Sequence, residues 1–531
     1  MGPSGFRVML VLMLALGALV VTIGVIARDD ALILVGLVCG VIPMVVRLLI
    51  AILGPVLAGG RQNPAPLPVA ETETYPDHNG PDTHWAEEDG LEQAKMFEDD
   101  QQIYLARWGR EHKLTGVSAV RRLMTFSNAS DDFYRSSAIP NALTTRDNVL
   151  VFETAGLVCK AVRDRRNQLG QKVIVLDPFG RSGSASDCFN PLDFLRPEGE
   201  GLITDAGMMA ELVLVPHLAS DLGPQDARVA RVLLQGLIIH TYRNGRERDR
   251  NLAGVHRNIT LPAHRFYPLL GELGDIDATE GRISDIALSL LDMSDERSSA
   301  ILAVCRKATA VFNVSEIEDI SGSTSFELED ITTARASVFV IGDPPDGYDQ
   351  PLTAWCRVVL GCLLSLITNR DSTRPTPPWL VMLDRIEALG RLVQLERLLG
   401  GGTASGGLTL WPCFSGVSAV MEVCHNWENV VGRSDVIQIF GQDGAFDLDW
   451  SAGLTAMSRF VDTGSRTGSN DAPVHLRGGD KPPMLKSVEV ARMPETEQLL
   501  FYKGVPPLRA TRLQWEDDDA FRLLATRPPT F

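Results

Sequence analysis

The stretch Pro378-Trp-Leu-Val-Met-Leu-Asp384 is a short, almost entirely apolar run that ends in an aspartate. Such a run predicts a strand buried on both faces, as in a parallel sheet covered by helices. At a nucleotide site, an aspartate at this strand end binds Mg²⁺, and a carboxylate beside it orients the attacking water. The residue that follows here is Arg385, which carries the opposite charge.

A second apolar run, Asn148-Val-Leu-Val-Phe152, predicts the strand that would lead into a phosphate-binding loop. Such a loop needs glycines for close backbone approach, a lysine for the phosphate oxygens and a Ser or Thr for Mg²⁺. The residues that follow are Glu153-Thr-Ala-Gly-Leu-Val-Cys-Lys160. Gly156 is the single glycine of that stretch, and Cys159 stands at the lysine position. Lys160 comes one residue late, and no hydroxyl residue follows it.

A third predicted strand, Lys172-Val-Ile-Val-Leu-Asp177, also ends in an aspartate. For both Asp177 and Asp384, two roles are open: a polar residue that closes a turn or hydrogen-bonds at the strand end, or a group of the catalytic site. The first role is favoured, because the loop and the second carboxylate that catalysis requires are missing.

The composition excludes several classes of function. The 531 residues carry a net charge of −17, which disfavours broad, nonspecific adhesion to DNA or anionic lipid. Arg163, Arg165 and Arg166 form either a local basic surface or, as we favour, a solvated helix end. The eight cysteines and nine histidines show no zinc or metalloprotease spacing, so no metal site is predicted.

The N-terminal region predicts a membrane anchor. Val8 to Ala27 and Ala31 to Val46 are apolar runs separated by three charged residues, and the first is long enough to span about 30 Å of hydrocarbon. A signal peptide is the alternative for the first run alone. We expect a transmembrane helical hairpin over residues 1–58, which places the protein in the inner (plasma) membrane, two-pass, with the bulk of the chain cytoplasmic.

The rest of the chain predicts an α/β fold: a P-loop NTPase-like, mostly parallel sheet with an inserted all-helical domain. Apolar runs such as Ala336 to Ile341 and Val436 to Phe440 are further strands, whereas Leu91 to Leu123 has a helical, charged pattern. Residues 400–407 and 462–479 are predicted loops. The expected order is a flexible linker (59–90), a first part of the sheet domain (91–203), the helical insertion (204–313) and a second part (314–531).

Several stretches in this order resemble the coupling-protein ATPases of type IV secretion and conjugation. Val173 to Gly180 and Phe189 to Asp193 are similar to the family's strand-D-P-K-G and F-N-P-L-D segments. Leu380 to Gly390 is similar to its Walker B segment, L-D-E-F-A-x-L-G, and Gln498 to Ala510 to its C-terminal strand and turn. Leu410 to Ser415 lies where the family has a strand ending in glutamine.

The resemblance implies a membrane-anchored protein that forms hexameric rings, recruits DNA-relaxase or protein cargo and uses ATP. The departures fall together at the ATP site: the loop around Gly156 is degenerate, Arg385 replaces the catalytic carboxylate, and Ser415 replaces the glutamine that would sense the γ-phosphate. Because three separate elements of the site are lost, ordinary hydrolysis is not expected.

Three hypotheses about function follow. The favoured one is a catalytically silent coupling-protein homologue without cofactor, acting in substrate recruitment or complex assembly. Its expected partners are type IV secretion channel proteins, protein or nucleoprotein cargo, and other subunits in a homo- or hetero-oligomer, including an intact paralogue. The alternative is an active motor that uses ATP and Mg²⁺ through a non-standard or partner-completed site, with Arg385 facing phosphate across a ring interface. The third is an unrelated membrane protein whose matches are generic α/β strands.

Overall fold

A computed structural model describes residues 84–98, 103–214, 221–274, 282–333, 335–342, 352–368, 378–402, 407–456 and 482–525. The predicted hairpin (1–58), the predicted linker up to residue 83 and the predicted loop at 462–479 lie outside them. Among the described residues no helix combines the length and the apolar character needed to cross a membrane.

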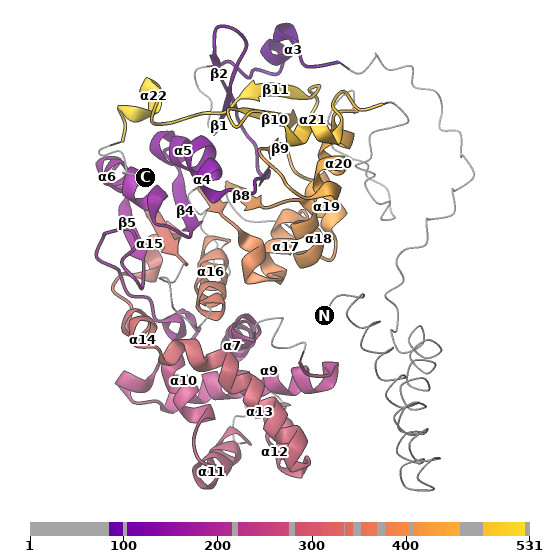
Figure 1. Ribbon diagram of the computed structural model, residues 1–531. Coiled ribbons are helices and arrows are strands. Elements are labelled where there is room, and N and C mark those ends of the chain that lie inside the picture. Colours follow the sequence, from indigo (N-terminus) through magenta and orange to yellow (C-terminus); the bar gives the residue numbers. More distant parts are fainter. Residues whose placement is uncertain are drawn as a thin grey trace, which may run out of the picture. The chain divides into compact units, whose positions relative to one another are not determined.

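The strands of the described chain form one sheet of eleven strands, in the order β2-β1-β11-β10-β9-β3-β8-β7-β4-β6-β5 (Figure 1). Their bounds are β1 Ile103–Trp108, β2 Lys113–Val117, β3 Leu123–Phe126, β4 Asn148–Glu153, β5 Lys172–Leu176, β6 Ala336–Ile341, β7 Trp379–Leu383, β8 Leu408–Phe414, β9 Val436–Ile439, β10 Glu497–Tyr502 and β11 Leu508–Thr511.

The half of the sheet from β9 to β5 is parallel, and the half from β9 to β2 is antiparallel. The parallel half therefore contains all three strands that the apolar runs at 148–152, 172–177 and 378–384 predict. A mostly parallel α/β sheet is confirmed for the described chain.

Helices precede the sheet, alternate with its strands and fill one long insertion. They are α3 Glu88–Gln93, α4 Ser130–Phe133, η1 Tyr134–Ala138, α5 Ile139–Thr144, α6 Leu157–Gln168, η2 Pro191–Phe194, α7 Gly199–Val213, α9 Pro224–Asn244, η3 Glu247–Asp249, α10 Leu252–Ile259, α11 Ala263–Gly274, α12 Arg282–Asp292, α13 Asp295–Thr309, η5 Ala310–Asn313, α14 Ser315–Ser321, α15 Leu328–Thr333, α16 Thr353–Ile367, η6 Ile386–Leu389, α17 Val393–Leu399, α18 Val417–Val423, α19 Trp427–Gly432, α20 Ala445–Leu454, α21 Ser487–Ala491 and α22 Asp519–Arg522.

The insertion between β5 and β6 contains helices and no strand among its described residues. Helices α9 to α13 pack against one another there, as Figure 1 shows. The described helices between β5 and β6 run from η2, which begins at Pro191, to α15, which ends at Thr333, whereas the sequence predicted a helical insertion over 204–313.

The parallel strands are buried on both faces, which explains why their sequences are continuously apolar. Val149 and Val151 of β4 belong to one hydrophobic cluster, together with residues of α5 and α6. Leu150 and Phe152 of the same strand belong to a second cluster, together with residues of α7 and α16. Alternate residues of a strand point to opposite faces, so each strand supplies both cores.

The helical interpretation of Leu91 to Leu123 is wrong. Among the described residues before 98 the one helix is α3, and the segment from 103 to 117 is the antiparallel pair β1–β2. Two of the charged residues that suggested a solvated helix, Arg110 and Glu111, lie at the turn between the two strands, where His112 has a positive φ of 50°. The mixed composition reflects a short exposed turn between half-buried strands, a pattern that resembles an amphipathic helix over a few residues.

The expectation of a solvated helix end at the three arginines is also wrong for Arg166, which is fully buried. Its guanidinium donates to the carbonyl oxygens of Ala142 (3.1 Å) and Thr145 (2.6 Å) and to the side chains of Ser337 (2.9 Å) and Gln171 (2.6 Å). Burial lowers its pKa to about 10, so it stays charged at neutral pH. Arg166 thus joins α5, α6 and β6.

We predict that Arg166→Ala lowers the free energy of unfolding by about 3 kcal/mol or more, because buried acceptors lose their donor. Arg165→Ala is the matched control, since Arg165 makes a single long hydrogen bond of 3.4 Å to the Leu143 carbonyl. It is expected to cost less than about 1 kcal/mol. Urea unfolding of the full chain measures both, and equal losses would contradict the role given to Arg166.

Candidate functional site

The carboxyl ends of β4 and β7 lie side by side, where a P-loop fold binds its nucleotide phosphates. The two strands are parallel neighbours, and the Asp384 amide donates to the Phe152 carbonyl at 3.0 Å. β4 ends at Glu153 and α6 begins at Leu157, so residues 154–156 make the whole connection. That connection is shorter than the G-x-x-x-x-G-K loop that encircles phosphates.

The first amides of α6 are occupied by a side chain of the same chain. The Glu153 carboxylate accepts hydrogen bonds from the backbone N–H of Val158 at 2.9 Å and of Cys159 at 2.8 Å. Helix N-terminal amides carry partial positive charge and are the donors that a P-loop presents to phosphate. Glu153, which is fully buried, therefore satisfies the donors that a bound phosphate would need.

The loop after β5 closes over the same turn. Asp177 accepts hydrogen bonds from the amides of Arg181 (3.0 Å) and Ser182 (2.6 Å) and from the Ser182 hydroxyl (2.7 Å). This places the Ser182 backbone against Gly156, where an added Cβ would lie 2.7 Å from the Ser182 nitrogen. Gly156 has a φ of +72°, so the glycine serves a tight turn and a close backbone contact inside the protein.

Asp384 is buried and is bound to a tyrosine. The Tyr134 hydroxyl donates to Asp384 Oδ2 at 2.7 Å and accepts from the Thr154 amide at 3.0 Å. Burial raises the Asp384 pKa to about 6, although the Tyr134 and Ser130 hydroxyls lower it. Burial and the nearby Asp384 raise the pKa of Tyr134 well above its usual value, so its hydroxyl keeps its proton.

Arg385 is held by its own chain. It has a left-handed backbone conformation (φ 45°) directly after β7. Its guanidinium donates to the Ser130 hydroxyl through Nε at 3.2 Å and to the Asn128 carbonyl through Nη2. The group that replaces the catalytic carboxylate therefore ties the β7 turn to the segment before α4.

The remaining predicted positions have separate surroundings. Ser415 donates its amide to Glu387 Oε1 at 2.9 Å, which links the ends of β7 and β8. Cys159 of α6 is buried in the core, and this burial raises the pKa of its thiol. Lys160 is exposed. The structure thus brings Gly156, Asp177 and the Asp384 region together and leaves the Lys160 side chain at the surface.

These residues do not fit a triphosphate with Mg²⁺. The helix amides already have the Glu153 carboxyl group as an acceptor, the Ser182 backbone occupies the space beside the turn, and Asp384 is bound to Tyr134. Among the described residues, no three side chains of His, Cys, Asp or Glu gather in a way that could hold a metal ion.

The sequence interpretation missed Glu153 and Tyr134. The available signal for Glu153 was an acidic residue that ends a buried strand directly before a helix, where N-terminal amides attract an anion. No sequence signal pointed to Tyr134, because it reaches the site from a different helix, η1.

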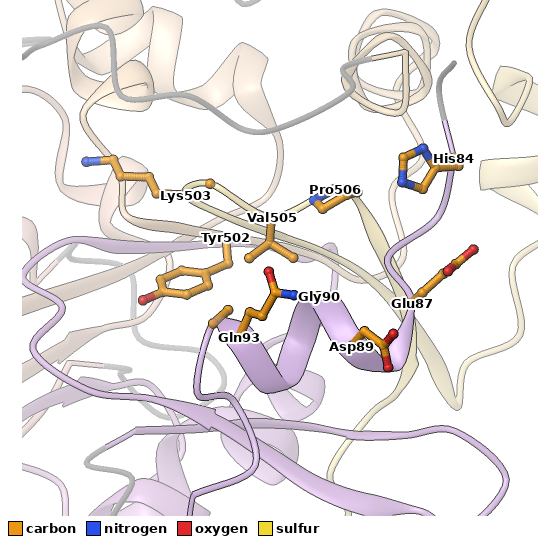
Figure 2. Close-up of a pocket in the computed structure, with 11 residues that line it drawn as sticks. His84, Glu87, Asp89, Gly90, Gln93, Tyr502, Lys503, Val505 and Pro506 are labelled. Carbon is orange, nitrogen blue, oxygen red and sulfur yellow. The ribbon is translucent and has the colours of Figure 1, made fainter. Parts of the chain in front are cut away.

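A cavity of about 400 Å³ lies elsewhere, between α3 and the β10–β11 turn. Figure 2 shows the carboxylates of Glu87 and Asp89 on the α3 side and Tyr502 on the turn side. Lys503, at its edge, pairs with Asp435 at 2.7 Å. The cavity includes none of the residues predicted for the nucleotide site.

The sheet order, the helical insertion and the residues at the β4 and β7 ends define a P-loop NTPase-like protein with an altered phosphate site. Residues 135–403 match the family model described as Type IV secretory system Conjugative DNA transfer. The chain belongs to this family, which confirms the resemblance read from its segments.

Curated relatives agree with this assignment. The conjugal transfer protein TraG of Rhizobium radiobacter is 26% identical over 392 residues, which are 72% of this chain and 60% of the relative. A conjugal transfer protein TraG of Escherichia coli is 21% identical over 317 residues, 56% of this chain and 49% of the relative. The chain thus spans about 60% or less of the length of these two relatives.

Solved structures of the bacterial conjugative coupling protein TrwB have the same fold. The form in complex with sulphate has a TM-score of 0.57 at 13% identity and covers 84% of this chain and 99% of its own. The form in complex with ADP and Mg²⁺ has a TM-score of 0.56 at 15% identity, with 83% and 96% covered.

The buried carboxyls predict a pH dependence of stability. Burial raises the Glu153 pKa from 4.5 to about 7, and that of Asp384 from 3.8 to about 6. The folded state then keeps protons that the unfolded state releases. This contribution to stability is complete below the unfolded pKa values and is lost as the pH rises through about 6 and 7.

We expect the free energy of unfolding to fall between about pH 5 and 7.5, with about 3 kcal/mol of the loss due to Glu153. Glu153→Gln keeps the shape of the side chain but does not titrate, so its profile should be flatter by that amount. Urea unfolding across this pH range measures the slope. An unchanged slope in the variant would mean that Glu153 titrates normally.

Proposed function

We propose that this protein is a catalytically silent coupling-protein homologue that is anchored in the inner membrane and acts in substrate recruitment or complex assembly. The single observation that carries the proposal is the Glu153 carboxylate on the first amides of α6. A side chain of the protein holds the position that phosphate needs. In this proposal the chain does not bind or hydrolyse a nucleotide at the β4–α6 turn, but it keeps the sheet and the helical insertion.

The conserved scaffold supports a role that depends on surfaces. The sheet positions the helical insertion through packing, which requires no hydrolysis. The relatives named as conjugal transfer proteins support type IV secretion channel proteins and protein or nucleoprotein cargo as partners. The apolar runs within residues 1–58 support the membrane anchor. An oligomer that contains an intact paralogue would supply the ATP hydrolysis that this chain lacks.

The first test is nucleotide binding by the detergent-solubilised full chain. We expect no ATP binding that Asp384→Asn weakens and no Mg²⁺-dependent ATP turnover above that of Asp384→Asn, because the phosphate donors of α6 are already used. Asp164→Asn, on the surface of α6, is the matched control. Mg²⁺-dependent turnover that Asp384→Asn abolishes and Asp164→Asn retains would establish the active motor instead.

The second test removes the internal carboxylate. Glu153→Ala frees the amides of Val158 and Cys159, so millimolar sulfate or phosphate should raise the melting temperature of this variant and leave the wild type unchanged. Glu489→Ala is the control, because Glu489 accepts from the Lys486 amide ahead of the short helix α21. Sulfate stabilisation of the wild type equal to that of Glu153→Ala would show that Glu153 does not fill an anion position.

A further inference from the structure

A second cavity of about 400 Å³ is lined by arginines from two different parts of the fold. Arg228 and Arg231 belong to α9 of the insertion, and Arg391 follows η6 in the sheet domain. The volume lies within the usual range for a small-molecule site. The cavity contains none of the residues of the β4–α6 turn, so it is independent of the nucleotide position.

The base of this cavity is a buried arginine without a carboxylate partner in direct contact. Arg357 on α16 is 2% exposed and donates to the carbonyls of Leu212 (2.9 Å), Leu389 (2.7 Å) and Arg391 (2.9 Å). Carbonyl oxygens satisfy its hydrogen bonds but do not neutralise its charge. Burial lowers its pKa to about 10, and the group remains a cation at neutral pH.

The other cationic groups of the cavity are only partly neutralised. Arg231 faces Glu211 at 3.5 Å, with both side chains nearly half exposed, and Arg391 pairs with Glu396 at 2.8 Å. Arg228 is exposed, and no ion pair joins it to any side chain in the described part of the chain. Four guanidinium groups are thus opposed by two carboxylates, in a chain whose net charge is −17.

We propose that this cavity binds a small molecule that carries a diphosphate group. Guanidinium forks match phosphate oxygens in pairs, and Arg228 and Arg231 lie one turn apart on the same face of α9. Arginines from both α9 and the segment after η6 line the cavity, so two phosphate groups of one ligand have cationic partners from both elements. The Arg357 hydrogen bonds hold that segment in place, which reduces the ordering that binding requires.

Glu211 gives the proposal a distinctive consequence. The Glu211 carboxylate competes with the ligand for Arg231. Glu211→Gln therefore frees the Arg231 guanidinium and removes a negative charge that repels the ligand. Loss of arginines should weaken binding, and loss of this one carboxylate should strengthen it. A general electrostatic attraction to the protein surface would not depend on these particular positions.

The test is calorimetric titration of the detergent-solubilised full chain with pyrophosphate, in a buffer without phosphate. We expect saturable binding that weakens about tenfold or more in the double variant Arg228→Ala, Arg231→Ala and tightens several-fold in Glu211→Gln. Arg248→Ala is the matched control, because Arg248 is 80% exposed and does not line the cavity. Unchanged melting temperatures without ligand establish that the variants fold.

Further titrations separate the sources of the diphosphate. ADP that binds more tightly than pyrophosphate identifies a nucleotide as the ligand, and equal or weaker binding identifies a diphosphate without a required base. Asp384→Asn should leave pyrophosphate binding unchanged, because Asp384 does not line this cavity. An absence of pyrophosphate binding would therefore contradict the cavity proposal without bearing on the proposed function. The proposal is overturned if pyrophosphate does not bind, if the double variant binds it as the wild type does, or if only a single-stranded oligonucleotide binds.

Discussion

The hydrogen bonds from the first amides of α6 to the Glu153 carboxylate are the constraint on which the β4–α6 region depends. A helix that begins in the protein interior must have acceptors for its N-terminal amides. In a P-loop those donors are left for a ligand; here the end of β4 supplies the acceptor. Once the acceptor is internal, the turn can be short, and the Ser182 backbone can pack directly on Gly156. One feature, the internal acceptor, then accounts for the absence of the glycines, the lysine and the hydroxyl residue of a P-loop from this turn.

The scaffold survives this change because its stability comes from elsewhere. The parallel strands contribute alternate residues to two hydrophobic cores, which join the sheet to the helices on its two faces. Arg385 illustrates the separation: it follows a strand that is wholly buried, yet its own partners are a backbone carbonyl and a serine hydroxyl just beyond the end of β3. The residues at the strand ends can therefore differ without disturbing the packing that defines the fold.

The short strand β3 (Leu123–Phe126) was not predicted. Strands β4, β5, β6, β7 and β9 of the parallel half were predictable from the sequence, because strands buried on both faces are largely apolar. The antiparallel edge was not, since the β1–β2 hairpin interleaves polar and apolar residues in a way that a short helix also does. The sequence identified Gly156, Asp177 and Asp384 as strand-end positions. It could not identify Tyr134 as a neighbour of Asp384, because the two residues are far apart in the sequence and meet only through the topology. The sequence suggested that Arg166 lies at the surface. No sequence pattern shows that the backbone carbonyls of Ala142 and Thr145 accept its hydrogen bonds in the core.

Arg357 fastens the last turn of α7 and the segment after η6 to α16 through one guanidinium. Breaking those bonds would leave a buried cation without acceptors, a cost of several kcal/mol. The first helix of the insertion and the chain leaving β7 must therefore move together as a single mechanical part. A force applied to the insertion through α7 is therefore delivered to the end of β7, a strand in the middle of the parallel half of the sheet.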